Sequence, residues 1–247
     1  MADVAAWPRQ PVALVLVPTY NERENLPVIA NLLLAYPNVR VLVIDDGSPD
    51  GTGALADQLA AASAGRLTVM HRTGRRGLGR SYLDGMRAAL ATDADVVFQM
   101  DADLSHDPKY VPDMIAAAAS HDLVIGSRYL QGVSVVNWPL RRLMLSTFAN
   151  WYVRRITGLK VRDCTAGFRC WRREAVAKLP LDRIRSDGYS FQVETLFLAA
   201  AAGCRVGEVP IIFVERREGA SKISGGVIRE SFFTPWRLVL RRLTGRL

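Results

Sequence analysis

The stretch VVFQMDADLSHDP, residues 96–108, joins an apolar run to a pair of aspartates and then to a turn. The apolar run predicts a buried β-strand over residues 95–100. Asp107 followed by Pro108 is typical of a helix start, because aspartate caps free backbone N–H groups and proline fits the first helical turn. A buried strand, a polar end and a new helix in close succession indicate a strand–loop–helix unit of an α/β fold.

Asp101 and Asp103 directly follow this strand. Residues i and i+2 of an extended segment point to the same side, so the two carboxylates are expected to face one point. Like charges held that close repel each other unless a cation or a hydrogen-bond donor lies between them. Two interpretations stay open: a Mg²⁺ or Mn²⁺ site completed by substrate phosphates, or an acidic turn before the next helix.

The same unit repeats through the first half of the chain. Apolar runs alternate with helical patterns, which predicts a mostly parallel sheet covered by helices on both faces. Ligands of such sheets bind outside the carboxyl ends of the strands. The predicted strands are 12–17, 39–45, 66–71, 95–100 and 122–127, and the predicted helices are 21–35, 50–62, 79–91 and 107–119.

Polar clusters follow four of these strands, so they are expected at one edge of the sheet. Besides the aspartates above, the clusters are PTYNE (18–22), DDGSPDGT (45–52) and SRY (127–129). Asp46 could accept hydrogen bonds from a ribose or a base, or it could only cap the next helix. Four clusters at one edge predict a nucleotide-sized site.

The segment GRRGLGRSYLDG, residues 74–85, resembles a dinucleotide-binding fingerprint but does not match it. Tyr82 stands where the third glycine of that motif would fall. The segment is interpreted as a flexible basic loop that opens a helix. Arg75 and Arg76 are then expected to be solvated.

The second half of the chain predicts two basic amphipathic helices, over 138–157 and from Thr234 onward. Their apolar faces could pack on the protein's own core or lie in an anionic membrane surface. Between them, 188–204 predicts a buried helix with one carboxylate, Glu194, and 206–224 predicts a strand that leads into a basic loop. The apolar faces comprise Leu140, Met144, Phe148 and Trp151 in the first helix and Trp236, Val239, Leu240 and Leu243 in the second.

The composition bounds the class of protein. The 247 residues carry a net charge of +8, which suggests a partner rich in phosphate. A nucleic acid is not expected, because the aromatic residues sit among aliphatic ones in helices and the aspartates at the strand ends would repel a phosphate backbone. The three cysteines form no metal-binding pattern, so they predict buried thiols.

Eight ordered motifs between residues 12 and 222 resemble the family 2 glycosyltransferases of GT-A fold, and most closely the dolichyl/polyprenyl-phosphate mannose synthases. The resemblance implies transfer of mannose from GDP-mannose to a polyprenyl phosphate, with inversion at the anomeric carbon and with Mg²⁺ or Mn²⁺. The motifs are PTYNERENL, DDGSPDGT, MDADLSH, GSRY, WPLRRLMLSTFAN, DCTAGFR, GYSFQVE and ERREGASK.

The resemblance also implies roles for individual residues. Asp101 and Asp103 would hold the metal, with Ala102 behind them and Ser105 where relatives often have a further ligand, glutamine. Arg128 would lie near the acceptor or the sugar. The guanosine pocket would comprise Pro18, Tyr20, Glu22, Ile44 and Asp46; the acceptor phosphate would meet Arg142 and Ser146; and Arg216 and Lys222 would close over the nucleotide phosphates.

A phosphate acceptor explains why the motifs offer no evident general base. The second pKa of a phosphomonoester is near 6, so the acceptor is already largely a dianion at neutral pH. One alternative stays open: a UDP-sugar donor such as UDP-glucose. An inactive protein that only binds sugar nucleotides is not expected, because the metal pair and the phosphate-binding cations look complete. The bases of GDP and UDP differ, but no residue of the sequence decides between them.

The resemblance divides the chain into a catalytic domain, residues 1–224, and a basic amphipathic segment, residues 225–247. No apolar run approaches the length of a membrane-spanning helix, and no signal peptide is evident. The protein is therefore expected to be cytoplasmic and peripheral at the inner face of the membrane, either by itself or through a membrane-anchoring partner.

Overall fold

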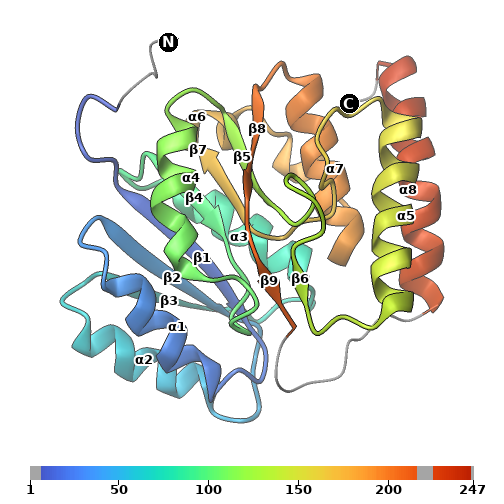
Figure 1. Cartoon of the computed structure of the whole chain (residues 1–247). Coiled ribbons are helices and arrows are strands. Elements are labelled where there is room, and N and C mark those ends of the chain that lie inside the picture. The colour runs from blue at the N-terminus through green and yellow to red at the C-terminus, as the bar shows by residue number, and fades with distance from the viewer. Residues whose placement is uncertain (1–6, 216–224, 246–247) are drawn as a thin grey trace.

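The computed structural model describes residues 7–215 and 225–245, with no side-chain description for 225–229. Alternating side chains of β1 (Ala13–Thr19) and β2 (Val39–Asp45) enter two different apolar layers. Leu14 and Leu16 pack on one face of the sheet, whereas Val15 and Val17 pack on the other. Strands that are apolar on both faces must be covered on both sides, so helices flank the sheet on each face (Figure 1).

The main sheet has seven strands in the order β3-β2-β1-β4-β7-β5-β8. All neighbouring pairs are parallel except those of β7, which runs antiparallel to both β4 and β5. The prediction of a mostly parallel sheet is confirmed. The remaining strands are β3 (Leu67–His71), β4 (Val96–Gln99), β5 (Leu123–Ser127), β7 (Arg169–Arg172) and β8 (Val206–Pro210), and β6 (Val135–Val136) pairs with β9 (Phe213–Val214) in a separate small sheet.

Two apolar layers organise the helices. One contains side chains of α1 (Asn25–Leu34), α2 (Thr52–Ala62) and α4 (Val111–Ala118), which follows the short helix η1 (Pro108–Tyr110). The other contains side chains of α3, α5, α6, α7 and α8. The bounds of this second group are α3 (Leu78–Leu90), α5 (Leu140–Thr157), α6 (Arg173–Ala177), α7 (Gly188–Ala201) and α8 (Gly225–Leu243), with η2 (Leu181–Arg183) before α7.

Helix α8 corrects one sequence prediction. It begins at Gly225 and continues through Pro235, whereas the sequence placed the helix start at Thr234. A proline inside a helix removes one backbone hydrogen bond, but its fixed φ is compatible with the helix. The helix packs beside α5 and α7 (Figure 1), where Thr234 and Leu238 are buried, and this packing supports it through the proline.

Other expectations can be compared with the structure directly. Cys164, Cys170 and Cys204 are buried free thiols, as predicted. No helix in the described part of the chain combines the length and apolar character that crossing a membrane requires. Arg216 and Lys222, predicted to bind the nucleotide phosphates, lie outside the described residues.

Candidate active site

A large polar cavity opens at the carboxyl ends of the central strands, with a volume of about 600 Å³. Its lining includes residues from all four polar clusters that follow β1, β2, β4 and β5. The prediction that these clusters meet at one edge of the sheet is confirmed. A cavity of this size accommodates a nucleotide-sized ligand.

Hydrogen bonds with Tyr82 and His106 orient Asp101. The Tyr82 hydroxyl donates to Asp101 Oδ1 at 2.9 Å, and the Asp101 amide donates to His106 Nδ1 at 3.3 Å. Burial, reinforced by the charge of Asp101, raises the pKa of Tyr82 well above its ordinary value, so the phenol keeps its proton. Burial lowers the pKa of His106. A neutral imidazole accepts at Nδ1, so His106 holds the backbone of Asp101.

Ser105 orients Asp103 in the same way. Its hydroxyl donates to Asp103 Oδ1 at 2.6 Å, and its backbone N–H donates to the same oxygen at 3.1 Å. Ser105 is 2% exposed and lines the cavity together with Asp101 and Asp103. This arrangement favours a supporting role for Ser105 over the metal-ligand role that the sequence predicted.

The donor set at this edge fits a hard divalent cation. Asp101 and Asp103 both line the cavity, and both have a second carboxylate oxygen beyond those bonded to Tyr82 and Ser105. Within the described ranges, no group of three His, Cys, Asp or Glu side chains could hold a metal. Mg²⁺ or Mn²⁺ sites typically have one or two protein carboxylates, and substrate phosphates and water fill the other coordination positions.

Most of the residues that the resemblance assigns to a guanosine pocket line the polar cavity. Pro18, Tyr20, Glu22 and Asp46 line it. Ile44 does not, because its side chain is 0% exposed and packs in the apolar layer between the sheet and α3. Ile44 lies one residue before the end of β2. The alternation of side chains along the strand directs Ile44 to the face of the sheet that α3 covers.

Asp46 is already held by the protein. Arg72 Nη1 forms an ion pair with Asp46 Oδ1, and the Gly77 N–H donates to Oδ2 at 2.9 Å. Each carboxylate oxygen can accept more than one hydrogen bond, so Asp46 can still contact a ligand. Its fixed orientation also ties the end of β2 to the loop before α3.

Arg76, in that loop, is exposed, as predicted, and it also lines the cavity, a position that the sequence did not predict. Arg76 Nη1 donates to the Tyr20 hydroxyl at 2.8 Å, and its guanidinium carbon lies 4.7 Å from the centre of the Tyr20 ring. The Gly79 N–H donates to Asp187 Oδ1 at 2.6 Å, which fixes the other end of the loop. Arg76 is therefore a positioned cation beside Tyr20 in the cavity.

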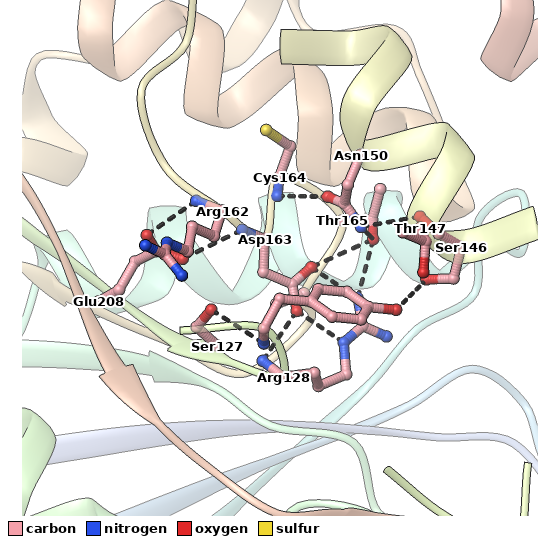
Figure 2. Close-up of polar contacts among 12 residues, drawn as sticks. Ser127, Arg128, Ser146, Thr147, Asn150, Arg162, Asp163, Cys164, Thr165 and Glu208 are labelled. Atoms are coloured by element: carbon pink, nitrogen blue, oxygen red, sulfur yellow. Dashed lines mark hydrogen bonds and ion pairs between the residues drawn. The ribbon is translucent and has the colours of Figure 1, made fainter. Parts of the chain in front are cut away.

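Arg128 lies at the centre of a buried polar network (Figure 2). Its Nε and Nη2 donate to the two oxygens of Asp163, each at 2.7 Å, and Asp163 is 0% exposed. Burial alone would raise the pKa of Asp163, but the charge and hydrogen bonds of Arg128 outweigh it and hold that pKa below its ordinary value. Arg128 also lines the polar cavity, where the resemblance places the acceptor or the sugar.

Arg142 and Ser146 come from α5. Arg142 forms an ion pair with Glu215 and stacks on Trp138, with its guanidinium carbon 4.3 Å from the ring centre. Ser146 Oγ accepts a hydrogen bond from the Tyr129 hydroxyl at 2.8 Å. Arg142 lines the polar cavity, whereas Ser146 lines an adjoining apolar groove.

Comparison with known proteins bears on the family of the chain. The model of the family described as "Glycosyl transferase family 2" matches residues 14–179, more than half of the chain. The chain belongs to glycosyl transferase family 2. The resemblance that the motifs indicated is thereby confirmed.

Two relatives of this family 2 glycosyltransferase extend the match over most of its length. A polyprenol monophosphomannose synthase of Mycolicibacterium smegmatis is 51% identical over 222 residues, which cover 89% of this chain and 84% of the relative. An undecaprenyl-phosphate mannosyltransferase of Micrococcus luteus is 46% identical over 231 residues, 92% of this chain and 95% of the relative.

Solved structures confirm the GT-A fold. Glucosyl-3-phosphoglycerate synthase of Mycobacterium tuberculosis in complex with Mn²⁺, UDP and phosphoglyceric acid aligns with a TM-score of 0.67 and 19% identity, over 92% of this chain and 78% of that one. Its complex with Mg²⁺ and UDP gives a TM-score of 0.62 and 20% identity, over 92% and 79% of the two chains. At that identity the likeness concerns the fold.

Two further residues of this glycosyltransferase site were not predicted from the sequence. Asp163, in the motif DCTAGFR, carried no assigned role because a pairing with Arg128 across 35 residues leaves no local pattern. Gln192, in GYSFQVE, lines the cavity from α7. A polar residue inside a largely apolar helix was the one available signal for it.

Proposed function

We propose that the protein transfers mannose from GDP-mannose to a polyprenyl phosphate, with inversion at the anomeric carbon. One observation carries the proposal: the polar cavity with the paired aspartates continues, past Arg128 and Arg142, into an apolar groove. A nucleotide sugar matches the polar part, and a phosphate attached to a lipid matches the junction and the groove. The names of the two relatives support the same donor sugar and acceptor class.

The groove has the chemistry that a lipid chain requires. It lies among α5, α7 and α8, has a volume of about 170 Å³, and includes Leu145, Phe148 and Val193 in its lining. Arg128, Arg142 and Thr165 line both the groove and the polar cavity. A phosphomonoester at this junction would meet the Arg142 guanidinium and the Nη1 group of Arg128. The Nε and Nη2 groups of Arg128 are already hydrogen-bonded to Asp163 and Thr165.

The acceptor phosphate acts as the nucleophile in the proposed reaction. One of its oxygens bonds to the anomeric carbon as the bond from that carbon to the GDP β-phosphate oxygen breaks. The dianion needs no general base, and Arg142 would hold it against the repulsion of the donor's phosphates. Asp101 and Asp103 would hold the divalent cation, which supplies stabilisation of the negative charge on the departing diphosphate.

The choice of base and sugar is tested by supplying GDP-mannose and UDP-glucose side by side with polyprenyl phosphate and Mn²⁺. We expect labelled lipid product from GDP-mannose and at most a few per cent of that rate from UDP-glucose. Equal or greater product from UDP-glucose would overturn the proposed donor, although the fold and the phosphate acceptor would stand. A polyprenol without phosphate is the matched control and should accept no sugar.

We also propose that α5 and α8 place the protein on an anionic membrane surface, and that residues 225–247 form a segment with that role. Trp236 and Leu240 on α8 are 56% and 62% exposed, and Met144 on α5 is 63% exposed. Most of the apolar side chains predicted to line one face of these helices are therefore exposed and do not pack in the core. Arg141, Arg154, Arg155 and Arg242 are exposed on the same two helices and suit anionic headgroups.

Part of the predicted basic face of α8 is, however, turned toward the protein. Arg237 Nη2 donates to Ser186 Oγ at 2.8 Å, and Arg241 pairs with the buried Glu194 at 2.7 Å. These contacts anchor α8 on the segment just before α7 and on the middle of α7. The membrane-facing part of α8 is thus its apolar side, centred on Trp236 and Leu240.

Replacing Leu240 or Met144 by aspartate should weaken binding to phosphatidylglycerol vesicles by about tenfold or more, because each change removes a large apolar side chain from the lipid interface. Co-sedimentation with vesicles measures the effect. Leu32→Asp is the matched control, since Leu32 is exposed on α1, away from α5 and α8 (Figure 1). Equal losses in all three variants would contradict the assignment of this face.

A further inference from the structure

Gln192 is a polar residue whose environment the mechanism above does not explain. Its side chain is 3% exposed, yet it lines the polar cavity from α7. Its carbonyl oxygen Oε1 is buried and has no hydrogen-bond partner. Buried polar atoms in folded proteins nearly always have a partner, and an exception at a binding site calls for a ligand group.

Gly167 locates the Gln192 amide relative to the metal carboxylates. A Cβ atom at Gly167 would lie 3.5 Å from Asp101 Oδ2 and 3.9 Å from Gln192 Nε2. His106 Cε1 would also lie 3.5 Å from that atom. The Nε2 end of the amide and the Asp101 carboxylate therefore border the same position, at which Gly167 has no side chain.

In the proposed function, the cavity that Gln192 lines has a nucleotide end with Tyr20, Glu22 and Arg76. Its acceptor end has Arg128 and Arg142. A sugar bound to a metal-held diphosphate must lie between these ends, because its anomeric carbon is attacked from the acceptor side. The Gln192 amide borders the position where the transferred sugar has to be.

The chemistry of the amide decides which ligand group it suits. A hydroxyl both donates and accepts, so it can bond to the carbonyl oxygen as well as to the N–H₂ group of glutamine. A phosphate dianion only accepts, and it cannot satisfy Oε1. The amide is also neutral and does not compete with Asp101 and Asp103 for the cation.

We propose that Gln192 determines sugar specificity by hydrogen-bonding a hydroxyl group of the transferred hexose beside the metal carboxylates. This proposal rests on the proposed function, since it presupposes a nucleotide-sugar donor in the polar cavity. The amide has to turn its oxygen toward the cavity that it lines when the sugar arrives. Gln192 is then a substrate-contacting residue that discriminates among donor sugars.

The test compares wild-type protein and Gln192→Met with GDP-mannose and with its 2-, 3-, 4- and 6-deoxy analogues. Methionine keeps the size of the side chain and removes its hydrogen-bonding groups. For wild-type protein, kcat/KM should fall about tenfold with the one analogue that lacks the contacted hydroxyl. For Gln192→Met, kcat/KM with GDP-mannose should be about tenfold lower, and that analogue should be no worse than GDP-mannose.

Stability provides a readout that separates specificity from folding. Gln192→Met removes a buried oxygen without a partner, so the melting temperature of the ligand-free protein should stay the same or rise. Gln58→Met is the matched control, because Gln58 is exposed on α2, and this variant should keep wild-type discrimination among the analogues.

Two outcomes would overturn the proposal. In one, Gln192→Met lowers kcat/KM by the same factor for GDP-mannose and for every deoxy analogue. In the other, the loss of kcat/KM in Gln192→Met varies with the acceptor that is supplied and not with the donor sugar. If wild-type protein uses a different nucleotide sugar, the proposed function fails, and the same comparison with the deoxy forms of that donor still tests Gln192.

Discussion

Replacing Asp101 or Asp103 by alanine is expected to lower transfer of mannose by about 100- to 1,000-fold while leaving the fold intact. Each carboxylate faces the cavity, and each is oriented by a dedicated donor, Tyr82 or Ser105. In each variant, the one remaining carboxylate would be the cation's protein ligand from this pair. The charge on the departing diphosphate would then be poorly stabilised.

Initial rates over a series of Mn²⁺ concentrations, together with thermal unfolding, measure this prediction. The melting temperature should change little, because removing one of two adjacent like charges relieves repulsion. Asp113→Ala is the matched control, since Asp113 is an exposed carboxylate on α4. Near-normal transfer by Asp101→Ala or Asp103→Ala would refute the assignment of the metal ligands.

The second large effect concerns stability. Asp163→Ala should lower the free energy of unfolding by about 3–5 kcal/mol, because it leaves the buried guanidinium of Arg128 without its carboxylate. Among its hydrogen bonds, the guanidinium would keep the one to the Thr165 hydroxyl, at 2.8 Å. Urea denaturation of the variant and the wild-type protein measures the difference.

The Arg128→Met variant and the double variant make this test specific to the pair. If the two side chains stabilise the protein through each other, the double variant should be less destabilised than the sum of the single variants. Additive losses would show that Asp163 acts instead through its other contacts, such as those with the Arg128 backbone N–H and Thr165.

The stability difference should also depend on pH. The pKa of Asp163 is lowered in the folded protein, so the charged pair stabilises the fold above the pKa of unfolded aspartate, about 3.9. The contribution is lost as the pH falls through the lowered folded pKa. The difference between wild-type protein and Asp163→Ala should therefore be full at pH 7 and should shrink below about pH 4.

The sequence predicted the parts of the fold that depend on local pattern. Buried apolar runs and helix-start signals placed β1, β2, β4 and β5 and brought their polar ends together. It did not predict β7, because RCWR, residues 169–172, carries two arginines and lacks a strand-like alternation. Arg169 is buried there and bonded to Thr195 and to the Cys164 and Ala166 carbonyl groups, a context that only tertiary packing supplies.

In the candidate site, too, local sequence pattern predicted some residues, whereas others depend on tertiary packing. Asp101 and Asp103 could be paired from their spacing along one strand end. Ile44 was expected in the nucleotide pocket and instead lies in the core, because one residue along a strand changes the face. Contacts across long sequence separations, such as Arg128 with Asp163, leave no local signal.

The measurement that tests the account most directly is transfer of labelled mannose from GDP-mannose to polyprenyl phosphate by wild-type protein, with Mn²⁺, with EDTA, and with Mn²⁺ restored. We expect labelled lipid with Mn²⁺, at least a 100-fold loss with EDTA, and recovery when the cation is returned. Labelled lipid formed equally well in EDTA would contradict a metal held by Asp101 and Asp103. Absence of product under every condition would contradict the proposed reaction itself.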